Sequence, residues 1–251
     1  MKRPFEIQFD RQIHSETIMV AIEFATNISS NQKKQEIITV MQKFADLGTV
    51  GALSGANVEP SRSTLQILQS KLDYVHGIWK FNDAHRIDCK SIYSLLNILH
   101  FIHEDINSIA NVKILWNEVK LLENPLAQQF PDMYSKVPFE INIDFENLEG
   151  NFDICVEFTE IQKLELAEEI NNTMGVWFSA INIGTYADDL FSPSDSHIFF
   201  TDDVSTVNTQ GIEWYIEEFH CNSCSLYGLI NLLHKVHDDK VHLKKVNILG
   251  W

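Results

Sequence analysis

The sequence is poor in cysteine and holds no long apolar run. Its four cysteines are too few and too unevenly spread for a disulfide framework. No apolar run approaches the ~18 residues needed to cross a bilayer. The first residues, MKRPFEIQFD, lack the apolar stretch of a secretion signal. We therefore expect a cytoplasmic protein with no membrane contact.

Basic residues are missing from one long stretch. No Lys or Arg occurs between Lys163 and Lys235, although 11 acidic residues fall there. Residues 1–120 hold 13 basic and 13 acidic side chains, whereas residues 121–251 hold 6 and 22 and so supply the whole net charge of −16. A field of one sign attracts cationic partners and repels nucleic acid and anionic lipid. The charge therefore predicts a basic protein partner rather than nucleic acid or a membrane.

Common catalytic and nucleotide-binding motifs are missing as well. The sequence has no G-x-G-x-x-G, no phosphate loop, no H-E-x-x-H and no nucleophile elbow. Active sites are also assembled from residues far apart in sequence, so enzymatic activity stays open but is not favoured. No cofactor is expected.

One short motif has the spacing of a metal or redox site. HCNSC (220–224) places Cys221 and Cys224 as a redox pair or half of a zinc site, with His220 beside them. The matching part of the first half holds Arg86, Ile87 and Lys90, and no second Cys-x-x-Cys exists. Buried or inert cysteines are favoured, and no metal site is assigned.

The two halves of the chain resemble each other. Residues 77–116 align with 211–250 without a gap and share 13 of 40 residues. PFEIQFD (4–10) matches PFEINID (138–144) at the same offset of 134. Such self-similarity indicates a repeated structural unit.

Hydrophobic periodicity predicts the order β-α-β-β-α-β in each half, which is the ferredoxin-like arrangement. We expect an α+β fold with an internal duplication of two such units. The charge-neutral repeat occupies residues 1–120, and a connector (117–137) leads to the acidic repeat within 121–251. In the first unit a helix at 31–48 is followed by TVGALSG (49–55), which reads as a strand with small residues. In the second unit a helix at 164–175 is followed by the corresponding strand WFSAINIG (177–184).

A polar stripe repeats on the second helix of each half. It reads Tyr93, Asn97, His100 and Glu104 in the first, and Tyr227, Asn231, His234 and Asp238 in the second. Three explanations stay open: packing of the two stripes against one another across a pseudo-twofold axis, hydrogen bonds to a neighbouring strand inside each unit, or a metal or acid–base site. Since a histidine pair supplies only two metal ligands, a framework role is favoured.

Aromatic and acidic residues alternate through residues 176–220 of the acidic half. The part TYADDLFSPSDS (185–196) reads as a surface loop. Aromatic anchors ringed by carboxylates suit a basic protein partner. The predicted partner-binding residues are Asp188, Asp189, Asp195, Asp202, Asp203, Glu213, Glu217, Glu218, Tyr186 and Phe191.

These observations predict an acidic intracellular protein that neutralises a basic partner. The leading hypothesis is an immunity or antitoxin-type inhibitor of a nuclease or similar toxin, whose cationic cleft an acidic surface would cover. The alternative is an enzyme or metal-binding protein with a site between the repeats, built from His100, His234 and the acids behind them.

Overall fold

The computed structural model describes residues 3–11, 17–28, 30–53, 65–82, 89–106, 108–116, 137–144, 149–186, 205–220 and 223–250. These ranges form two five-stranded sheets and four helices, which confirms the α+β class. In chain order the elements are β1 (Glu6–Arg11), β2 (Ile18–Phe24), α1 (Asn31–Thr49), β3 (Ile67–Leu72), β4 (His76–Phe81), α2 (Cys89–Ile106), β5 (Ile109–Trp116), β6 (Glu140–Ile143), β7 (Glu149–Phe158), α3 (Leu164–Ile181), β8 (Ser205–Val207), β9 (Gly211–His220), α4 (Ser223–Asp239) and β10 (Leu243–Gly250).

Both sheets follow the same strand order. The first sheet runs β1-β5-β2-β4-β3, and the second runs β6-β10-β7-β9-β8. β1 pairs with β5 in parallel, as β6 does with β10, and the other described pairings are antiparallel. Each element of the first half (β1–β5 with α1 and α2) therefore has a counterpart in the second half (β6–β10 with α3 and α4).

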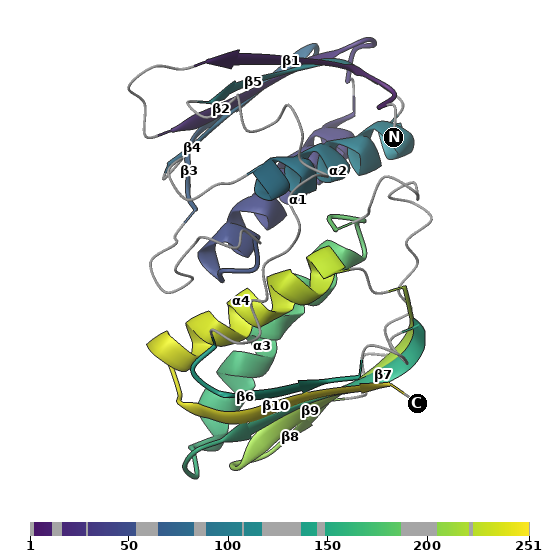
Figure 1. Ribbon diagram of the computed structural model, residues 1–251. Helices are drawn as coiled ribbons and strands as arrows, with labels where there is room; N and C mark the ends of the chain where they lie inside the picture. The colour runs from purple at the N-terminus through teal and green to yellow at the C-terminus, as the bar shows by residue number, and fades with distance from the viewer. Residues whose placement is uncertain are drawn as a thin grey trace.

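The four helices lie between the two sheets, so the molecule has four layers (Figure 1). α1 and α2 cover one face of the first sheet, and α3 and α4 cover one face of the second. On β2, Ile18, Val20 and Ile22 are buried, whereas the residues between them are more accessible. This alternation means that each sheet turns its apolar side to the helices and its other side outward.

Helices α1 and α3 are followed by the same kind of turn, which contains a glycine with positive φ. The φ angle is 78° at Gly51 and 65° at Gly184. The next N–H, that of Ala52, donates to the Leu47 carbonyl over 2.8 Å, and that of Thr185 donates to the Ala180 carbonyl over 3.2 Å. This is a Schellman turn, in which glycine takes a left-handed conformation that costs other residues energy.

The strand predicted at residues 49–55 is wrong. Thr49 is the last residue of α1, and residues 50–53 form the turn after it. The small residues that suggested a strand serve this turn, because Gly51 takes a positive φ and Ala52 packs into the core of the second half. A strand of this half that the sequence pattern did not reveal is β3.

The strand predicted at residues 177–184 is also wrong, because α3 continues to Ile181. Trp177, Phe178, Ala180 and Ile181 are all buried there. A helix end that packs both on its own sheet and on α1 loses its polar side, and its apolar run then resembles a buried strand.

The gapless alignment of the two halves is off by one residue along β4 and β9. Val20 of β2 lies opposite Trp79, whereas its counterpart Ile154 lies opposite Trp214. The two tryptophans are buried at equivalent places although they are 135 residues apart. The helix-end glycines are 133 apart, so small length differences cancel along the chain.

Gly175 inside α3 and Gly184 in the turn after it predict opposite effects on stability. A Cβ at Gly175, inside the helix, meets nothing within 4 Å, so Gly175→Ala should raise the free energy of unfolding by about 0.5–1 kcal/mol. Gly184→Ala should lower it by about 1 kcal/mol, because alanine is strained at positive φ. Urea unfolding of both variants measures the change in the free energy of unfolding. Equal changes in the two variants would contradict the left-handed conformation of Gly184.

Candidate functional site

The helix layers of the two halves meet through buried hydrogen bonds to backbone carbonyls. The Asn97 side chain on α2 donates from Nδ2 to the Thr185 carbonyl over 3.0 Å. The Tyr186 hydroxyl donates to the Ala52 carbonyl over 2.9 Å. Asn97 of the polar stripe therefore contacts the second half at Thr185, which is not a residue of the stripe on α4. Tyr186, predicted as a surface anchor, is instead buried in this seam.

Apolar side chains also cross the seam in both directions. Ile183 belongs to the core of the first half, while Leu47 and Ala52 belong to the core of the second. The backbone approaches closely at Gly228 of α4, where a Cβ would lie 2.7 Å from the Ala52 carbonyl oxygen. The seam is thus a packed interface between the helix layers.

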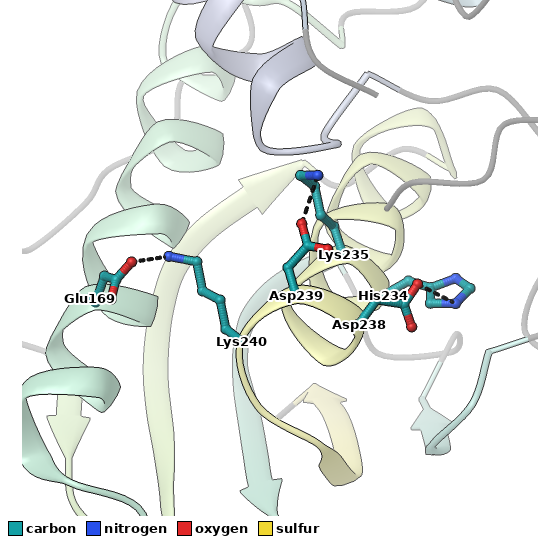
Figure 2. A network of polar contacts seen from close by, with 6 residues as sticks. All are labelled: Glu169, His234, Lys235, Asp238, Asp239 and Lys240. Carbon is teal, nitrogen blue, oxygen red and sulfur yellow. Dashed lines mark hydrogen bonds and ion pairs between the residues drawn. The ribbon is translucent and has the colours of Figure 1, made fainter. Parts of the chain in front are cut away.

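His100 and His234 contact charged side chains of their own half. The His100 Nε2 atom lies 3.4 Å from a Glu104 oxygen, and its Nδ1 atom lies 3.2 Å from Nη1 of Arg3. Burial first, and then the Arg3 charge, lower the pKa of His100, which the Glu104 carboxylate opposes. The matching pair in the second half, His234 and Asp238, is 3.7 Å apart (Figure 2).

The neighbouring histidines bond the strand that follows each helix. His103 Nδ1 lies 3.2 Å from the Ile109 carbonyl, and His237 Nδ1 accepts the N–H of Leu243 over 3.0 Å. His103 and His237 thus tie each helix to the strand that follows it, although neither residue belongs to the polar stripe. Among the described residues, no three His, Cys, Asp or Glu side chains gather as metal ligands. Cys221 and the side chain of Cys224 lie outside those residues.

Carboxylates gather on the outward side of the second sheet. Cys155 of β7 lies opposite Glu213 of β9, with 3.7 Å between Sγ and a Glu213 oxygen. Asp153 and Glu157 flank Cys155 on the same side of β7, because strand side chains alternate. Burial first, and then these three carboxylates, raise the pKa of the Cys155 thiol to about 11. Asp153, Glu157 and Glu213 are called the acidic face below.

The same places on the first sheet have a different chemistry. Strand pairing makes Met19, Ala21 and Ile78 the counterparts of Asp153, Cys155 and Glu213, and only Glu23 matches an acid, Glu157. The same comparison shows that three outward lysines of the first sheet have uncharged counterparts in the second. These pairs are Lys71 and Thr206, Lys80 and Tyr215, and Lys113 and Asn247.

Two lysines of β10 neutralise part of the surrounding charge. Lys244 lies 3.0 Å from Glu157, and Lys245 lies 2.9 Å from Glu140. Within the described part of the chain, no ion pair involves Asp153 or Glu213. Asp153 and Glu213 are therefore the members of the acidic face that have no ion pair among the described residues.

Of the predicted partner-binding residues, the structure describes few. Glu213 is exposed on the outward side of β9. Glu217 and Glu218 belong to β9, but their side chains lie outside the described residues, as do Asp188, Asp189, Asp195, Asp202, Asp203 and Phe191. Sequence reasoning missed Asp153 and Glu157, whose signal was the alternation of acidic and apolar residues in NFDICVEF (151–158).

No family model matches the chain, and no curated protein matches its sequence. Among solved structures, similarity is found to a protease from Helicobacter pylori, with a TM-score of 0.23, 9% identity, and coverage of 96% of this chain and 80% of that one. Complex III2 from Candida albicans, Inz-5 bound, has a TM-score of 0.23 and 9% identity, with coverage of 94% of this chain and 78% of that one. A conserved protein from Enterococcus faecalis V583 has a TM-score of 0.20 and 8% identity, with coverage of 92% of this chain and 77% of that one. TM-scores this low carry no argument about function.

None of the described helices combines the length and the apolar content needed to cross a membrane.

The thiol of Cys155 reports the charge of the acidic face. Its raised pKa predicts slow alkylation by iodoacetamide at neutral pH and a rate that rises toward pH 11. Glu213→Gln should lower this pKa and speed the reaction, whereas Glu140→Gln, which removes an acid already paired with Lys245, should change it less. Mass spectrometry of the peptide that contains Cys155 measures the rate. Equal rates in wild type and Glu213→Gln would contradict the arrangement.

The lowered pKa values of His100 and His237 predict lower stability in acid. Burial foremost lowers the pKa of both His100 and His237 in the folded protein, so the unfolded chain binds protons first as pH falls. Their contribution to stability is complete above the unfolded value of about 6.5 and is lost as pH falls through the lower folded values. We expect the free energy of unfolding to decrease between about pH 7.5 and about pH 5.

His237→Asn tests whether His237 contributes to this pH dependence of stability, because the asparagine oxygen can accept the Leu243 N–H without titrating. Urea unfolding at both pH values should show a smaller decrease in this variant. An unchanged decrease would exclude His237 as a source of the pH dependence.

Proposed function

We propose that this protein is an intracellular binding protein that neutralises a basic protein partner through the acidic face of its second sheet. The observation that carries the proposal is the convergence of Asp153, Glu157 and Glu213 around Cys155, where the first sheet has a single acid. The charge of residues 121–251, with 6 basic and 22 acidic side chains, supports it.

The chemistry of this face suits a cationic protein. Charge on an open sheet surface speeds encounter and sets the register of binding more than it adds affinity. Nearby side chains supply contact area: Tyr215 lies opposite Asp153 on β9 and accepts a hydrogen bond from Asn151 over 3.2 Å. Nucleic acid and anionic membranes are disfavoured partners, because the same field repels them.

Within that class, an immunity or antitoxin-type inhibitor of a nuclease or similar toxin fits best. Such a toxin carries a cationic cleft for nucleic acid, and an acidic sheet face can occupy the same cleft. The acids of residues 188–203 extend the negative sequence that leads into β8 and β9. We place the protein in the cytoplasm, where such an inhibitor meets its toxin and a free thiol such as Cys155 is maintained.

We also propose that the chain arose by duplication of a ferredoxin-like unit. Leaving out β1 and β6, each half has the order β-α-β-β-α-β. Its four strands are then arranged β5-β2-β4-β3 or β10-β7-β9-β8, all antiparallel. The repeated glycine turns and the 13 shared residues support common descent.

Binding of a fluorescent oligolysine peptide tests the acidic face. The double variant Asp153→Asn/Glu213→Gln should bind it about twofold to thirtyfold more weakly, because each of the two exposed charge contacts contributes about 0.2–1 kcal/mol. The matched control is Glu6→Gln/Glu23→Gln on the first sheet, which should bind like wild type. Affinity should also fall as salt rises. Equal weakening by both double variants would show that only net charge matters.

The toxin-inhibitor class needs a separate experiment. If a neighbouring gene encodes a protein with a basic C-terminal toxin domain, the purified domain should lose activity when this protein is added. Inhibition should weaken with Asp153→Asn/Glu213→Gln, and with Asn at positions 188, 189, 202 and 203. A toxin domain that stays fully active would overturn this class while leaving the acidic face itself untouched.

A further inference from the structure

A groove of about 500 Å³ lies along α1 in the first half. Its apolar lining comes from Val40 of α1, Phe101 and Ile102 of α2, and Ile183 beyond the end of α3. Its polar lining includes Glu36 and Lys43 of α1. This volume falls in the range of about 300–1,000 Å³ that is typical of small-molecule sites. The groove is referred to as the Lys43 groove.

Lys43 is the cation of this groove and is half-buried. Burial lowers the pKa of its ammonium group below its usual range. No ion pair joins it to a carboxylate among the described side chains. Glu36 lies seven residues earlier, about 10 Å along the helix axis, and accepts a hydrogen bond from Gln32 over 2.9 Å. A half-buried ammonium gains most from an anion brought by a ligand.

The second half provides an internal comparison. Because the helix-end glycines are 133 residues apart, Lys43 corresponds to Val176 and Glu36 to Glu169. Phe101 corresponds to Lys235 at the offset of α2 and α4. There the charged groups pair with each other: Glu169 with Lys240, and Lys235 with Asp239 at 2.8 Å (Figure 2). A lysine that has no ion pair with a described carboxylate and that lines a groove together with an aromatic ring is therefore a feature of the first half.

We propose that the Lys43 groove binds a small amphipathic anion, namely a carboxylate with an aliphatic or aromatic tail. The carboxylate pairs with the Lys43 ammonium, and the tail covers Phe101, Ile102 and Ile183. Because Ile183 comes from the second half, such a ligand contacts both halves at their seam. This site is independent of the acidic face, which lies on the outward side of the other sheet.

Isothermal titration of the whole protein with decanoate tests the site, with the uncharged decanol as the matched probe. Wild type should bind decanoate saturably and more tightly than decanol. Lys43→Met should weaken decanoate binding about tenfold, as expected for loss of a charged hydrogen bond, and leave decanol binding unchanged. Lys33→Met, an exposed lysine of the same helix, should bind like wild type.

Phe101→Ala should weaken both probes, since it removes part of the apolar wall while Lys43 stays. Circular dichroism and thermal unfolding check that each variant is folded; Lys43→Met removes a half-buried charge and should not destabilise the protein. Equal affinity of wild type and Lys43→Met for decanoate would overturn the proposal. So would equal affinity of wild type for decanoate and decanol, or the absence of saturable decanoate binding.

Discussion

Two backbone carbonyls, those of Ala52 and Thr185, join the halves of this molecule. Each follows a helix-end glycine, where the chain leaves the helix and its carbonyl needs a donor from elsewhere. Tyr186 supplies one donor and Asn97 the other, each from the opposite half. Leaving a buried carbonyl unpaired costs about 1–3 kcal/mol, so these side chains and the glycines that allow the close approach constrain one another.

The helix layers face inward because of this seam, and the sheets therefore present their other sides outward. Residues in the seam must satisfy two cores at once, as Ile183 and Leu47 do. Residues on the outward sides of the sheets do not have to pack against a second core. This explains how the second sheet holds Asp153 and Glu213 where the first holds Met19 and Ile78, while the tryptophans of β4 and β9 keep the same buried place.

Much of the fold was predictable from sequence, because apolar residues alternate in residues 18–24 and recur at helical spacing in α1, α2 and α4. The end of α3 was not, since Trp177 to Ile181 pack on two neighbours and lose the helical pattern. Tyr186 looked like a loop aromatic because its partner, the Ala52 carbonyl, lies 134 residues away. The charge of the second half was evident, but Asp153 and Glu157 emerge as a site only when β7 and β9 are paired.

The displacement of β9 against the sequence alignment shows how a sheet surface can change its character. Ile78 and Ile212 align in sequence, yet Ile78 points outward and Ile212 points into the core. Strand side chains alternate, so whether a connecting loop is odd or even in length decides which set of residues meets the solvent. One residue gained upstream can thus turn over a whole strand and exchange its inner and outer chemistry without a single substitution in it.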